Sequence, residues 1–547
     1  MSQPSYPPLD MAGSATFPEL LGVITRERAD HCALVAGDDT LTYAELEEWT
    51  RRTAKALLAD GVGKGTRIAL LASDGVLSLT TFYAALRVGA LVTLVSTLAT
   101  PPELAHILRT SDAQLLIGMR RFLRHDYAET LEAALPELTE ASTQRLWLRS
   151  APYLRSVWLD DADGAAWAVS LGEALSRADG PDGPDDELLT AVEREVSPAD
   201  DAFVVYTSGS TALPKAVVHS QATVVTKPQA LAPIFCMTPE DRVLALLPAF
   251  WLGGIATALQ VLVTGSTLIY PASPAEDDVL EMVVRHDPTY AVVWHAQRKL
   301  RAVAKERDID LRRIRGLGSW PRDAHGERIP PGLRANLLGM SETFSAHSAE
   351  PLDVRMPDDK KDSCGRPIHG IERRVVDPET GEQVAPGEVG ELQVRGAGLM
   401  TGFYKVPREQ VFTPDGFYPT KDLVRVDDDG YLWFVGRIGD MIKTSSANVS
   451  RHEVEAALNA LPDVDVALVV GLPDPEIGEM VVSAVVPAPG ATPTEEDLRA
   501  QLRGRLSSFK IPRRIVFIGD DDVPRTTTGK VRLTDLADVV AAHLPDA

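Results

Sequence analysis

The chain has 547 residues, which is enough for two to four domains with ample core. A hydrophobic fraction of 44% and a charged fraction of 24% are typical of a soluble globular protein. The net charge of −23 excludes a general polyanionic partner, so we expect neither nucleic-acid binding nor binding to an acidic membrane surface. Three widely spaced cysteines, Cys32, Cys236 and Cys364, show no metal-ligand spacing and favour reduced thiols in a cytoplasmic protein.

The first segments of the chain alternate between helix and strand patterns. Residues 1–16 contain proline and serine without a basic or strongly apolar stretch, which predicts a flexible arm rather than a targeting segment. Residues 41–61 show helical periodicity, 66–73 form an apolar run typical of a buried strand, and 78–96 predict a helix followed by a strand. This alternation indicates parallel or mixed sheets that are covered by helices.

The next segment, residues 140–200, is rich in Asp, Gly and Pro and predicts a less ordered connector. It leads to residues 206–220, YTSGSTALPKAVVHS, which lie between an apolar strand pattern and a further apolar segment. Backbone N–H groups of such small residues can close on phosphate oxygens, and the hydroxyls and the lysine add to them. The loop does not match the GxxxxGK[ST] phosphate loop, and an ordinary solvent-exposed turn is the alternative.

The most apolar stretch, residues 243–269, is long enough to suggest a membrane span. Pro248, the Gly253-Gly254 pair and Gly265 instead divide it into strand, turn, helix and strand, so we expect no membrane insertion. Helix–strand alternation returns around residues 280–294.

The pattern changes in the last third of the chain. Turn signals such as DPETGEQ and TPDGFY predict compact hairpins over residues 364–436. A fresh α+β pattern starts after Asp440, which predicts a domain boundary near residues 437–440.

Four separate short stretches place polar residues in loops. GMSETF contains Ser341 and Glu342, YPTKD contains Asp422, GRIGDMIK contains Arg437 and Lys443, and PRTTTGK ends at Lys530. Each stretch alone is typical of a solvated surface loop. Their combination and their order along the chain carry the interpretation.

These stretches together resemble the adenylate-forming superfamily of acyl- and aryl-CoA synthetases, nonribosomal adenylation domains and luciferases. The resemblance runs from about residue 17 to 540 and is nearest to bacterial acyl- or aryl-CoA ligases. YTSGSTALPK is similar to the phosphate-binding signature of that family, and LPAFWLGG (247–254) to its aromatic motif beside the acyl pocket. LGMSE, YPTKD, GRIGDMIKTSSANV and VPRTTTGK resemble, in order, the Y-G-x-T-E element, the Y-x-T-G-D element, the hinge with its following loop, and the terminal P-x-x-x-x-G-K.

The resemblance implies an α/β fold class with a particular division of the chain. A large N-terminal domain of helix-covered β-sheets with a β-barrel-like subdomain would span residues 17–436. A hinge at 437–440 would join it to a small mobile α+β domain at 441–547. Such a hinge lets one active site present two arrangements in turn.

The resemblance also implies an AMP-forming ligase that uses ATP and Mg²⁺, with CoA as co-substrate. A small-molecule acid would attack the α-phosphate, pyrophosphate would leave, and a thiol would then displace AMP. The implied catalytic residues are Lys215, Glu342, Lys443 and Lys530, with Glu342 as the Mg²⁺ ligand. The implied nucleotide-binding residues are Thr207, Ser208, Gly209, Ser210, Thr211, Lys215, Ser341, Glu342, Asp422, Arg437 and Lys530.

An acid pocket follows from the same resemblance. Two tryptophans and a histidine in it favour an aromatic or small cyclic acid over a long acyl tail, unless Trp251 and Trp294 are simply core aromatics. The implied pocket residues are Trp251, Gly253, Gly254, Trp294, His295, Gly318, Ser319, Gly339 and Met340.

Departures from the family pattern leave the acceptor open. Lys421 and Ser446 each stand where the family has glycine, and the second position is where pantetheine passes. The alternative is therefore adenylation with a non-CoA acceptor, through amide formation or ATP-dependent diazotisation with an activated small inorganic acid. A non-catalytic nucleotide-binding protein is least favoured, because the four residues Lys215, Glu342, Asp422 and Lys530 all remain. We expect a monomer or homodimer.

Overall fold

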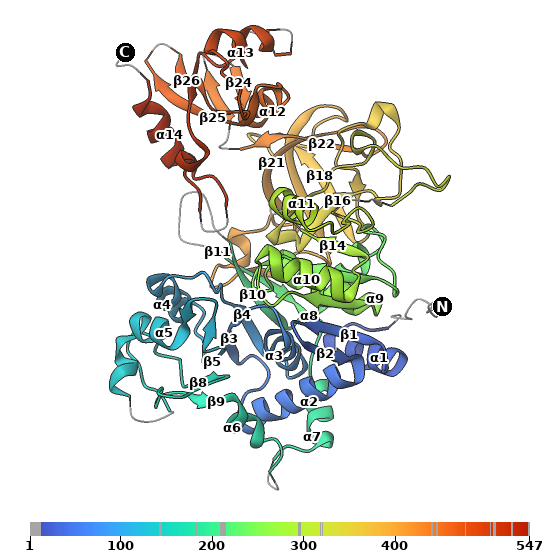
Figure 1. Cartoon of the computed structure of the whole chain (residues 1–547), viewed down its shortest axis with the longest axis vertical. Helices are drawn as coiled ribbons and strands as arrows, with labels where there is room; N and C mark the ends of the chain where they lie inside the picture. The colour runs from blue at the N-terminus through green and yellow to red at the C-terminus, as the bar shows by residue number, and fades with distance from the viewer. Residues whose placement is uncertain are drawn as a thin grey trace. The chain divides into compact units, whose positions relative to one another are not determined.

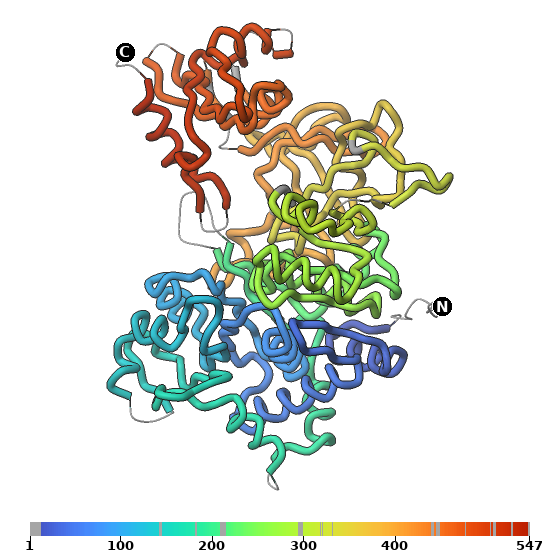
Figure 2. Tube along the Cα trace, viewed as in Figure 1, coloured from blue at the N-terminus to red at the C-terminus, as the bar shows by residue number. Residues whose placement is uncertain are grey.

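The structure is a computed structural model in which the described residues form two compact units (Figure 2). The first unit comprises residues up to 207, 215–372 and 395–412, and the second comprises 373–394 and the chain from 413 onward. The residues that the structure describes are 13–141, 145–180, 183–207, 215–293, 297–317, 319, 321–438, 441–444, 447–475, 477–503, 505–506, 510–526 and 529–544.

The first unit contains an eight-stranded sheet in the order β20-β11-β10-β4-β3-β5-β8-β9 (Figure 1). The strands from β10 to β9 pair in parallel, whereas β11 pairs antiparallel with both β10 and β20. The central strands are buried on both faces, as strands of a helix-covered parallel sheet must be. The strands are β3 (Arg67–Leu71), β4 (Leu91–Leu94), β5 (Leu115–Gly118), β8 (Ser156–Leu159), β9 (Val169–Ser170), β10 (Asp201–Thr207), β11 (Lys215–Ser220) and β20 (Gly402–Phe403).

A second sheet of the first unit has five strands in the order β14-β12-β13-β1-β2. All its neighbours pair in parallel except β1 and β2, which form an antiparallel hairpin. The strands are β1 (Cys32–Ala36), β2 (Asp39–Thr42), β12 (Arg242–Ala245), β13 (Thr267–Tyr270) and β14 (Tyr290–Val292). The main helices of the unit are α1 (Phe17–Arg28), α2 (Tyr43–Ala59), α3 (Val76–Arg87), α4 (Pro101–Thr110), α5 (Tyr127–Ala134), α8 (Gln221–Leu231), α9 (Leu252–Thr264), α10 (Glu276–His286) and α11 (Gln297–Glu306).

The apolar stretch of residues 243–269 divides into strand, turn, helix and strand, as predicted. Helix α9 is buried nearly all round and packs against α8 and α1. Gly265 ends it with a left-handed backbone, φ 69°, which glycine adopts without steric strain. No helix in the described part of the chain is long and apolar enough to cross a membrane.

The prediction of a less ordered connector at residues 140–200 is wrong where the segment forms regular elements. This segment contributes β8 and β9 to the large sheet and forms two helices, α6 (Leu171–Ser176) and α7 (Asp186–Arg194). Trp158 and Trp167 of this segment are fully buried. These side chains order the segment although turn-forming residues dominate its composition.

The second unit contains most of a four-stranded sheet, β18-β19-β21-β22, at the place of the predicted hairpins. It also contains an α+β part in which β24, β23, β26 and β25 form a sheet and β27 pairs in parallel with β26. Helices α12 and α13 pack on one face of that sheet and α14 on the other, because successive side chains of β25 and β26 point to opposite faces (Figure 1). The elements are β18 (Ile371–Val376), β19 (Val389–Gly396), β21 (Tyr418–Val426), β22 (Leu432–Arg437), β23 (Met441–Thr444), β24 (Ala447–Ser450), α12 (Arg451–Asn459), β25 (Val464–Asp474), β26 (Gly478–Pro487), α13 (Glu495–Leu502), β27 (Arg514–Phe517) and α14 (Leu533–Ala542).

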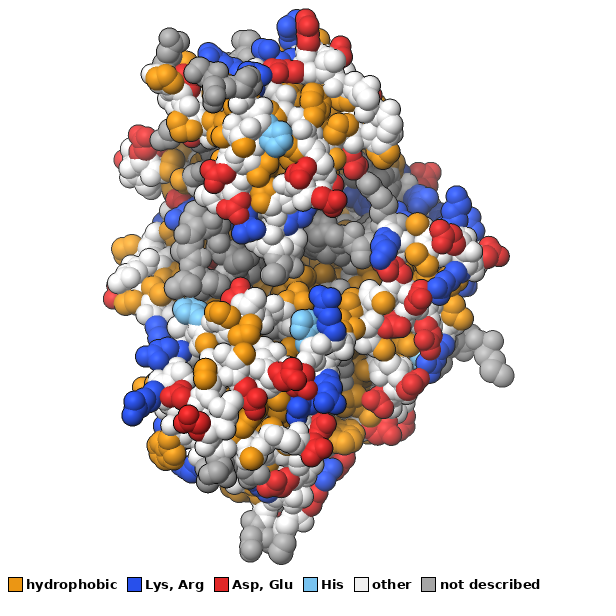
Figure 3. Space-filling view, turned by 60° about the vertical axis from the view of Figure 1, so that its left-hand side comes forward, with side chains coloured by type: hydrophobic (Ala, Val, Ile, Leu, Met, Phe, Trp, Pro, Cys, Tyr) orange, Lys and Arg blue, Asp and Glu red, His pale blue; other side chains and the backbone are white. Residues whose placement is uncertain are grey.

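Helix-covered sheets in the first unit and an α+β part at the end of the chain confirm the predicted α/β fold class. Gly439 and Asp440 of the predicted hinge lie outside the described residues. The predicted domain boundaries stay predictions. Acidic and basic side chains are intermixed over the face drawn in Figure 3, so no single-sign patch dominates that face.

Candidate active site

The two ends of the predicted phosphate loop are neighbours in the large sheet. Thr207 ends β10 and pairs in antiparallel register with Lys215, the first residue of β11, and the Thr207 hydroxyl donates to the Lys215 carbonyl oxygen at 3.4 Å. Lys215 is exposed, and its Nζ lies 5.1 Å from the centre of the Phe403 ring. Ser208, Gly209, Ser210 and Thr211 lie outside the described residues.

The loop therefore joins two antiparallel strands, and a helix does not follow it directly. Helix α8 begins only at Gln221, where the Ser220 hydroxyl accepts a hydrogen bond from the backbone N–H of Thr223. The helix dipole acts within the first turn of a helix and cannot contribute at Lys215. The lysine, the hydroxyls and backbone N–H groups of the loop are left to bind an anion.

Glu342 lies in a tight turn between two short antiparallel strands, β15 (Leu338–Met340) and β16 (Ser345–Ala349). The turn ends at Phe344 and Ser345, whose φ angles of 52° and 101° lie in a region that side chains disfavour. The Glu342 carbonyl accepts a hydrogen bond from the Met400 N–H at 2.9 Å, and its side chain is half-buried. Several contacts therefore hold a strained turn beneath this carboxylate.

His219 of β11 contacts this turn through a hydrogen bond and a ring contact. Its ring is fully buried between Phe203 and Phe344. The centre of the His219 ring lies 5.1 Å from that of Phe203 and 5.2 Å from that of Phe344. Burial lowers the pKa of His219 to about 3, so the ring is neutral at pH 7. Its Nε2 lies 2.9 Å from the Ser341 carbonyl oxygen, which requires Nε2 to carry the proton and donate.

Lys227 of α8 is a second buried base near the turn. Its side chain is 1% exposed, and its Nζ donates to the Ala346 carbonyl oxygen at 2.7 Å. Burial lowers the pKa of Lys227 to about 7. Neither His219 nor Lys227 was predicted from the sequence as a residue of the site. Their signal was a single polar residue inside an apolar strand and another inside a mostly buried helix.

The aromatic motif forms the turn into α9. Trp251 precedes the first residue of α9, is half-buried, and contacts the Phe250 ring edge-on at 5.7 Å between ring centres. It is therefore not a fully buried core aromatic. A Cβ on Gly254 would lie 2.1 Å from the Pro248 carbonyl oxygen, so only glycine fits there.

A half-buried acid, Asp74, binds the backbone of the same turn. The Asp74 Oδ1 accepts a hydrogen bond from the Ala249 N–H at 2.6 Å. Burial raises the pKa of Asp74 to about 6, although this hydrogen bond opposes the rise.

The remaining predicted pocket residues divide into two groups. Gly339 and Met340 belong to β15, directly before Glu342, and a Cβ on Gly339 would lie 2.2 Å from the Ser345 carbonyl oxygen. The Ser319 hydroxyl donates to the Arg313 carbonyl oxygen at 3.2 Å. Trp294, His295 and Gly318 lie outside the described residues.

Asp422 and Arg437 are neighbours in the second unit. They pair in register across β21 and β22, and the Arg437 Nε lies 3.6 Å from the Asp422 Oδ1. The Asp422 side chain is only 5% exposed, whereas that of Arg437 is 47% exposed. Lys421 has a φ of 64°, which explains why glycine is the expected residue at this position.

Lys530 is exposed and lies on a loop of the same unit. Its backbone N–H donates to the Thr526 hydroxyl at 3.1 Å, and its carbonyl accepts from the Thr526 N–H at 2.7 Å. Gly529, with a φ of 77°, closes this turn. Lys443 lies in β23 opposite Asn448, and its side chain falls outside the described part of the chain.

The donor set around Glu342 fits one kind of metal ion. No group of three or more His, Cys, Asp or Glu residues could hold a metal among the residues that the structure describes. A single half-buried carboxylate fits Mg²⁺, which proteins commonly bind through one or two carboxylates together with substrate phosphates and water.

Residues 24–404 match the family model described as AMP-binding enzyme, and residues 453–530 match the AMP-binding enzyme C-terminal domain. The chain belongs to the AMP-binding enzyme family. The predictions of this family and of an AMP-forming ligase of the acid–CoA ligase type are confirmed at the level of the family. Membership of this family does not determine which acid is activated or which acceptor receives the acyl group.

Named relatives of the AMP-binding enzyme align over nearly the whole chain. It is 29% identical over 533 residues to a 3-hydroxybenzoate–CoA ligase of Aromatoleum sp. (strain CIB), covering 94% of each chain. It is 30% identical over 504 residues to a feruloyl-CoA synthase of Amycolatopsis sp., covering 90% of this chain and 93% of the relative. Its fold matches the amide bond synthetase McbA from Marinactinospora thermotolerans with a TM-score of 0.74 and 25% identity, covering 95% and 99% of the two chains.

Proposed function

We propose that this enzyme activates a carboxylic acid with ATP as an acyl-adenylate and then transfers the acyl group to the thiol of CoA. In the first step a carboxylate oxygen bonds to the α-phosphorus, and the bond to the β-phosphate bridging oxygen breaks, so pyrophosphate leaves. In the second step the thiol sulfur bonds to the acyl carbon, its proton is released, and AMP leaves with its electron pair.

One observation carries this proposal. Lys215 and His219 are four residues apart in β11 and therefore lie on the same face of that strand. Lys215 ends the phosphate loop, and His219 holds the turn that carries Glu342. Strand β11 thus carries the cation proposed to bind phosphate and also fixes the turn of the carboxylate proposed to bind the metal ion. Adenylation requires both groups to be held in position around the same phosphates.

The proposed roles follow from charge and reach. Lys215, Thr207 and the loop residues Ser208, Gly209, Ser210 and Thr211 would hold the leaving pyrophosphate, and Glu342 beside Ser341 would hold Mg²⁺. Mg²⁺ would neutralise phosphate charge. In the second unit, buried Asp422 would accept hydrogen bonds from the ribose hydroxyls beside Arg437, and exposed Lys530 would stabilise charge at the α-phosphate. Lys443 would act with the acceptor thiol.

An aromatic acid is the proposed substrate class. Two of the relatives named above are ligases for hydroxybenzoate and ferulate, both of which carry an aromatic ring. Trp251 is half-buried at the start of α9, beside Gly253 and Gly254, and can offer a flat apolar surface there. Gly339 and Met340 would complete the pocket with Trp294, His295, Gly318 and Ser319.

A second candidate remains for the acceptor of the acyl group. The alternative acceptor is an amine, as in the amide bond synthetase to which the fold is similar at 25% identity. Ser446, where the family has glycine, lies outside the described residues. We keep CoA as the proposed acceptor because the hydroxybenzoate and ferulate relatives, which align over nine-tenths of the chain, are named as forming CoA thioesters.

The test is pyrophosphate release across a panel of aromatic and aliphatic acids, with CoA, with simple amines and with neither. We expect at least one aromatic acid to give pyrophosphate, and CoA to raise turnover with formation of its thioester. An amide product without any thioester would replace CoA by an amine. Pyrophosphate release from none of the acids would overturn the proposal.

A further inference from the structure

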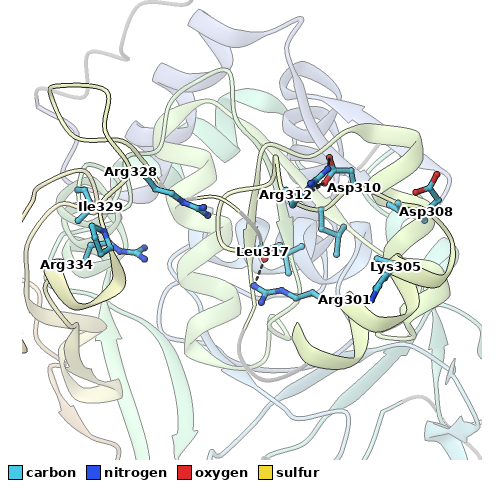
Figure 4. Close-up of a pocket in the computed structure, with 13 residues that line it drawn as sticks. Arg301, Lys305, Asp308, Asp310, Arg312, Leu317, Arg328, Ile329 and Arg334 are labelled. Atoms are coloured by element: carbon cyan, nitrogen blue, oxygen red, sulfur yellow. Dashed lines mark hydrogen bonds and ion pairs between the residues drawn. The ribbon is translucent and has the colours of Figure 1, made fainter. Parts of the chain in front are cut away.

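A pocket of about 810 Å³ beside α11 lies apart from the candidate active site, because neither Lys215 nor Glu342 lines it. Figure 4 shows the side chains of its wall, where Arg312 binds Asp310 at 2.9 Å and Arg301 donates to a backbone carbonyl. Contacts of this kind stabilise the wall and do not specify a ligand. The residues that hold the turn of Glu342 belong instead to helix α8.

Helix α8 presents two fully buried polar side chains on one face. Thr223 and Lys227 are 0% and 1% exposed, and they are neighbours on the helix surface because they are four residues apart. The Lys227 Nζ donates to the Ala346 carbonyl oxygen of β16 at 2.7 Å. The Thr223 hydroxyl donates to the Leu399 carbonyl oxygen at 3.2 Å. One helix face therefore binds two segments that are far apart in the sequence.

These two segments both hold the turn that carries Glu342. Strand β16 follows the turn directly, and its Ala346 pairs with Gly339 of β15 on the other side of the turn. Met400, which follows Leu399, donates its N–H to the Glu342 carbonyl oxygen at 2.9 Å. Because the turn is strained, its conformation depends on such outside contacts. A shift of either segment should therefore move the Glu342 carboxylate.

A lysine is an unfavourable choice for the buried position 227. Burial lowers the pKa of Lys227 to about 7, which reflects the cost of removing an amine from water. Methionine would fill a similar space without this cost. Gly398 leaves room for the side chain, since a Cβ there would lie 2.7 Å from the Lys227 Cδ and 3.3 Å from its Nζ. The fold thus accommodates a buried amine that donates to β16.

We propose that Lys227 is a positioning residue for Glu342, and that its hydrogen bond to β16 keeps this carboxylate in place to bind Mg²⁺ with the phosphates of ATP. The inference rests on the function proposed above, in which Glu342 holds the metal ion. Mg²⁺ demands near-ideal octahedral geometry, so a small displacement of its carboxylate ligand weakens the metal contact. Removing a group that orients a metal ligand commonly lowers metal affinity or activity by about 10- to 100-fold.

The test is equilibrium binding of ATP to the wild type and to Lys227→Met, with excess Mg²⁺ and, separately, with EDTA. Methionine keeps an unbranched side chain and removes the hydrogen-bond donor. We expect the variant to bind ATP about tenfold more weakly with Mg²⁺, and within about twofold of the wild type in EDTA. A role confined to stability would leave the ratio of the two affinities unchanged.

Gly398→Ala is a second variant, because its Cβ displaces the Lys227 side chain without removing it. We expect a loss of at least about threefold that is again confined to binding with Mg²⁺, and this variant decides the outcome if Lys227→Met does not fold. Thr226→Ala is the matched control. Thr226 is exposed on α8, and its hydroxyl donates to the Ala222 carbonyl oxygen within the helix, so the control should change neither affinity.

The possible failures can be told apart. Unchanged affinities in the variants, or equal losses with Mg²⁺ and with EDTA, would overturn the inference while the proposed function stands. Binding of ATP by the wild type that does not depend on Mg²⁺ would also overturn it. No binding of ATP by the wild type would overturn the proposed function and the inference together. None of these measurements depends on turnover.

Discussion

A few single residues determine the conformation of the turn that carries Glu342. The turn before β16 combines two positive φ angles with a half-buried carboxylate, and it is held by a neutral histidine and a buried lysine. Such an arrangement is unfavourable locally and persists only where the surrounding contacts determine it. Glu342 is therefore positioned by residues that have no part in the proposed chemistry.

Lys227→Met should change how stability depends on pH. The folded state lowers the pKa of Lys227 from 10.5 to about 7, so between these values the unfolded state binds more protons. Stability from this group therefore rises as pH increases from 7 toward 10, by an amount on the order of 3 kcal/mol, and Lys227→Met should lack this rise. Denaturant unfolding of both proteins at pH 7 and pH 10 measures the difference. Parallel pH profiles would contradict the burial argument.

Lys421→Gly should stabilise the second unit. Lys421 is exposed with a φ of 64°, and its backbone hydrogen bonds to Glu391 and Ile438 need no side chain. Removing Cβ relieves strain of roughly 1 kcal/mol, partly offset by the greater freedom of glycine in the unfolded chain. We expect a net gain of about 0.5 kcal/mol in thermal or denaturant unfolding. Lys421→Ala, which keeps Cβ, is the control and should give no such gain.

At the scale of elements, β11 and α9 position the candidate active site. Strand β11 carries Lys215 at one end and His219 on the same face, so it links the phosphate loop to the turn of Glu342. Helix α9 starts directly after Trp251, where its first turn packs against the Pro248 backbone. Both elements are largely buried, which limits how far the residues they carry can move.

Gly254→Ala should disturb the start of α9 far more than Gly253→Ala. A Cβ at Gly254 meets backbone atoms of Pro248, whereas one at Gly253 meets the end of the Leu247 side chain at 2.8 Å, which can rotate away. We expect a loss of about 2–3 kcal/mol in unfolding free energy for Gly254→Ala and under about 1 kcal/mol for Gly253→Ala. The KM for the acid should rise with the first variant. Equal effects of the two variants would show that the packing at Pro248 is not what fixes this turn.

At the scale of the whole molecule, the sequence predicted the parts that depend on local pattern. The helix at 43–59, the strand at 67–71 and the breaks around α9 follow from periodicity and from glycine or proline positions. The elements within residues 140–200 were not predicted, because two buried tryptophans and other buried apolar side chains outweigh the many turn formers. His219 and Lys227 were missed because a polar residue inside an apolar segment does not reveal which turn, more than a hundred residues away, its side chain contacts.

The family resemblance supplied what periodicity could not. Glu342 and Lys530 stand in loops that resemble any solvated loop, and only the order of the motifs singled them out. Helix α8 follows the phosphate loop only after β11, which pairs with β10 and extends the sheet to β20.

Lys530→Ala should stop adenylate formation while ATP still binds. Lys530 is exposed on a turn held by Thr526 and Gly529, so its removal should leave the fold intact. Loss of a cation that acts in the transition state should slow the first step by about 100- to 1,000-fold without a matching change in ATP affinity. Pyrophosphate release and equilibrium ATP binding measure the two effects, with Lys510→Ala, a lysine paired with Glu453, as the control. Wild-type pyrophosphate release by Lys530→Ala would remove this residue from the proposed site.

The central claim is that an acid oxygen bonds to the α-phosphorus of ATP. It can be tested with an accepted acid whose carboxylate oxygens are both ¹⁸O, followed by mass spectrometry of the nucleotide after turnover with CoA. Because the later step breaks the bond between acyl carbon and oxygen, we predict that AMP gains one ¹⁸O atom per turnover. Unlabelled AMP, or the formation of ADP and phosphate in its place, would contradict the account.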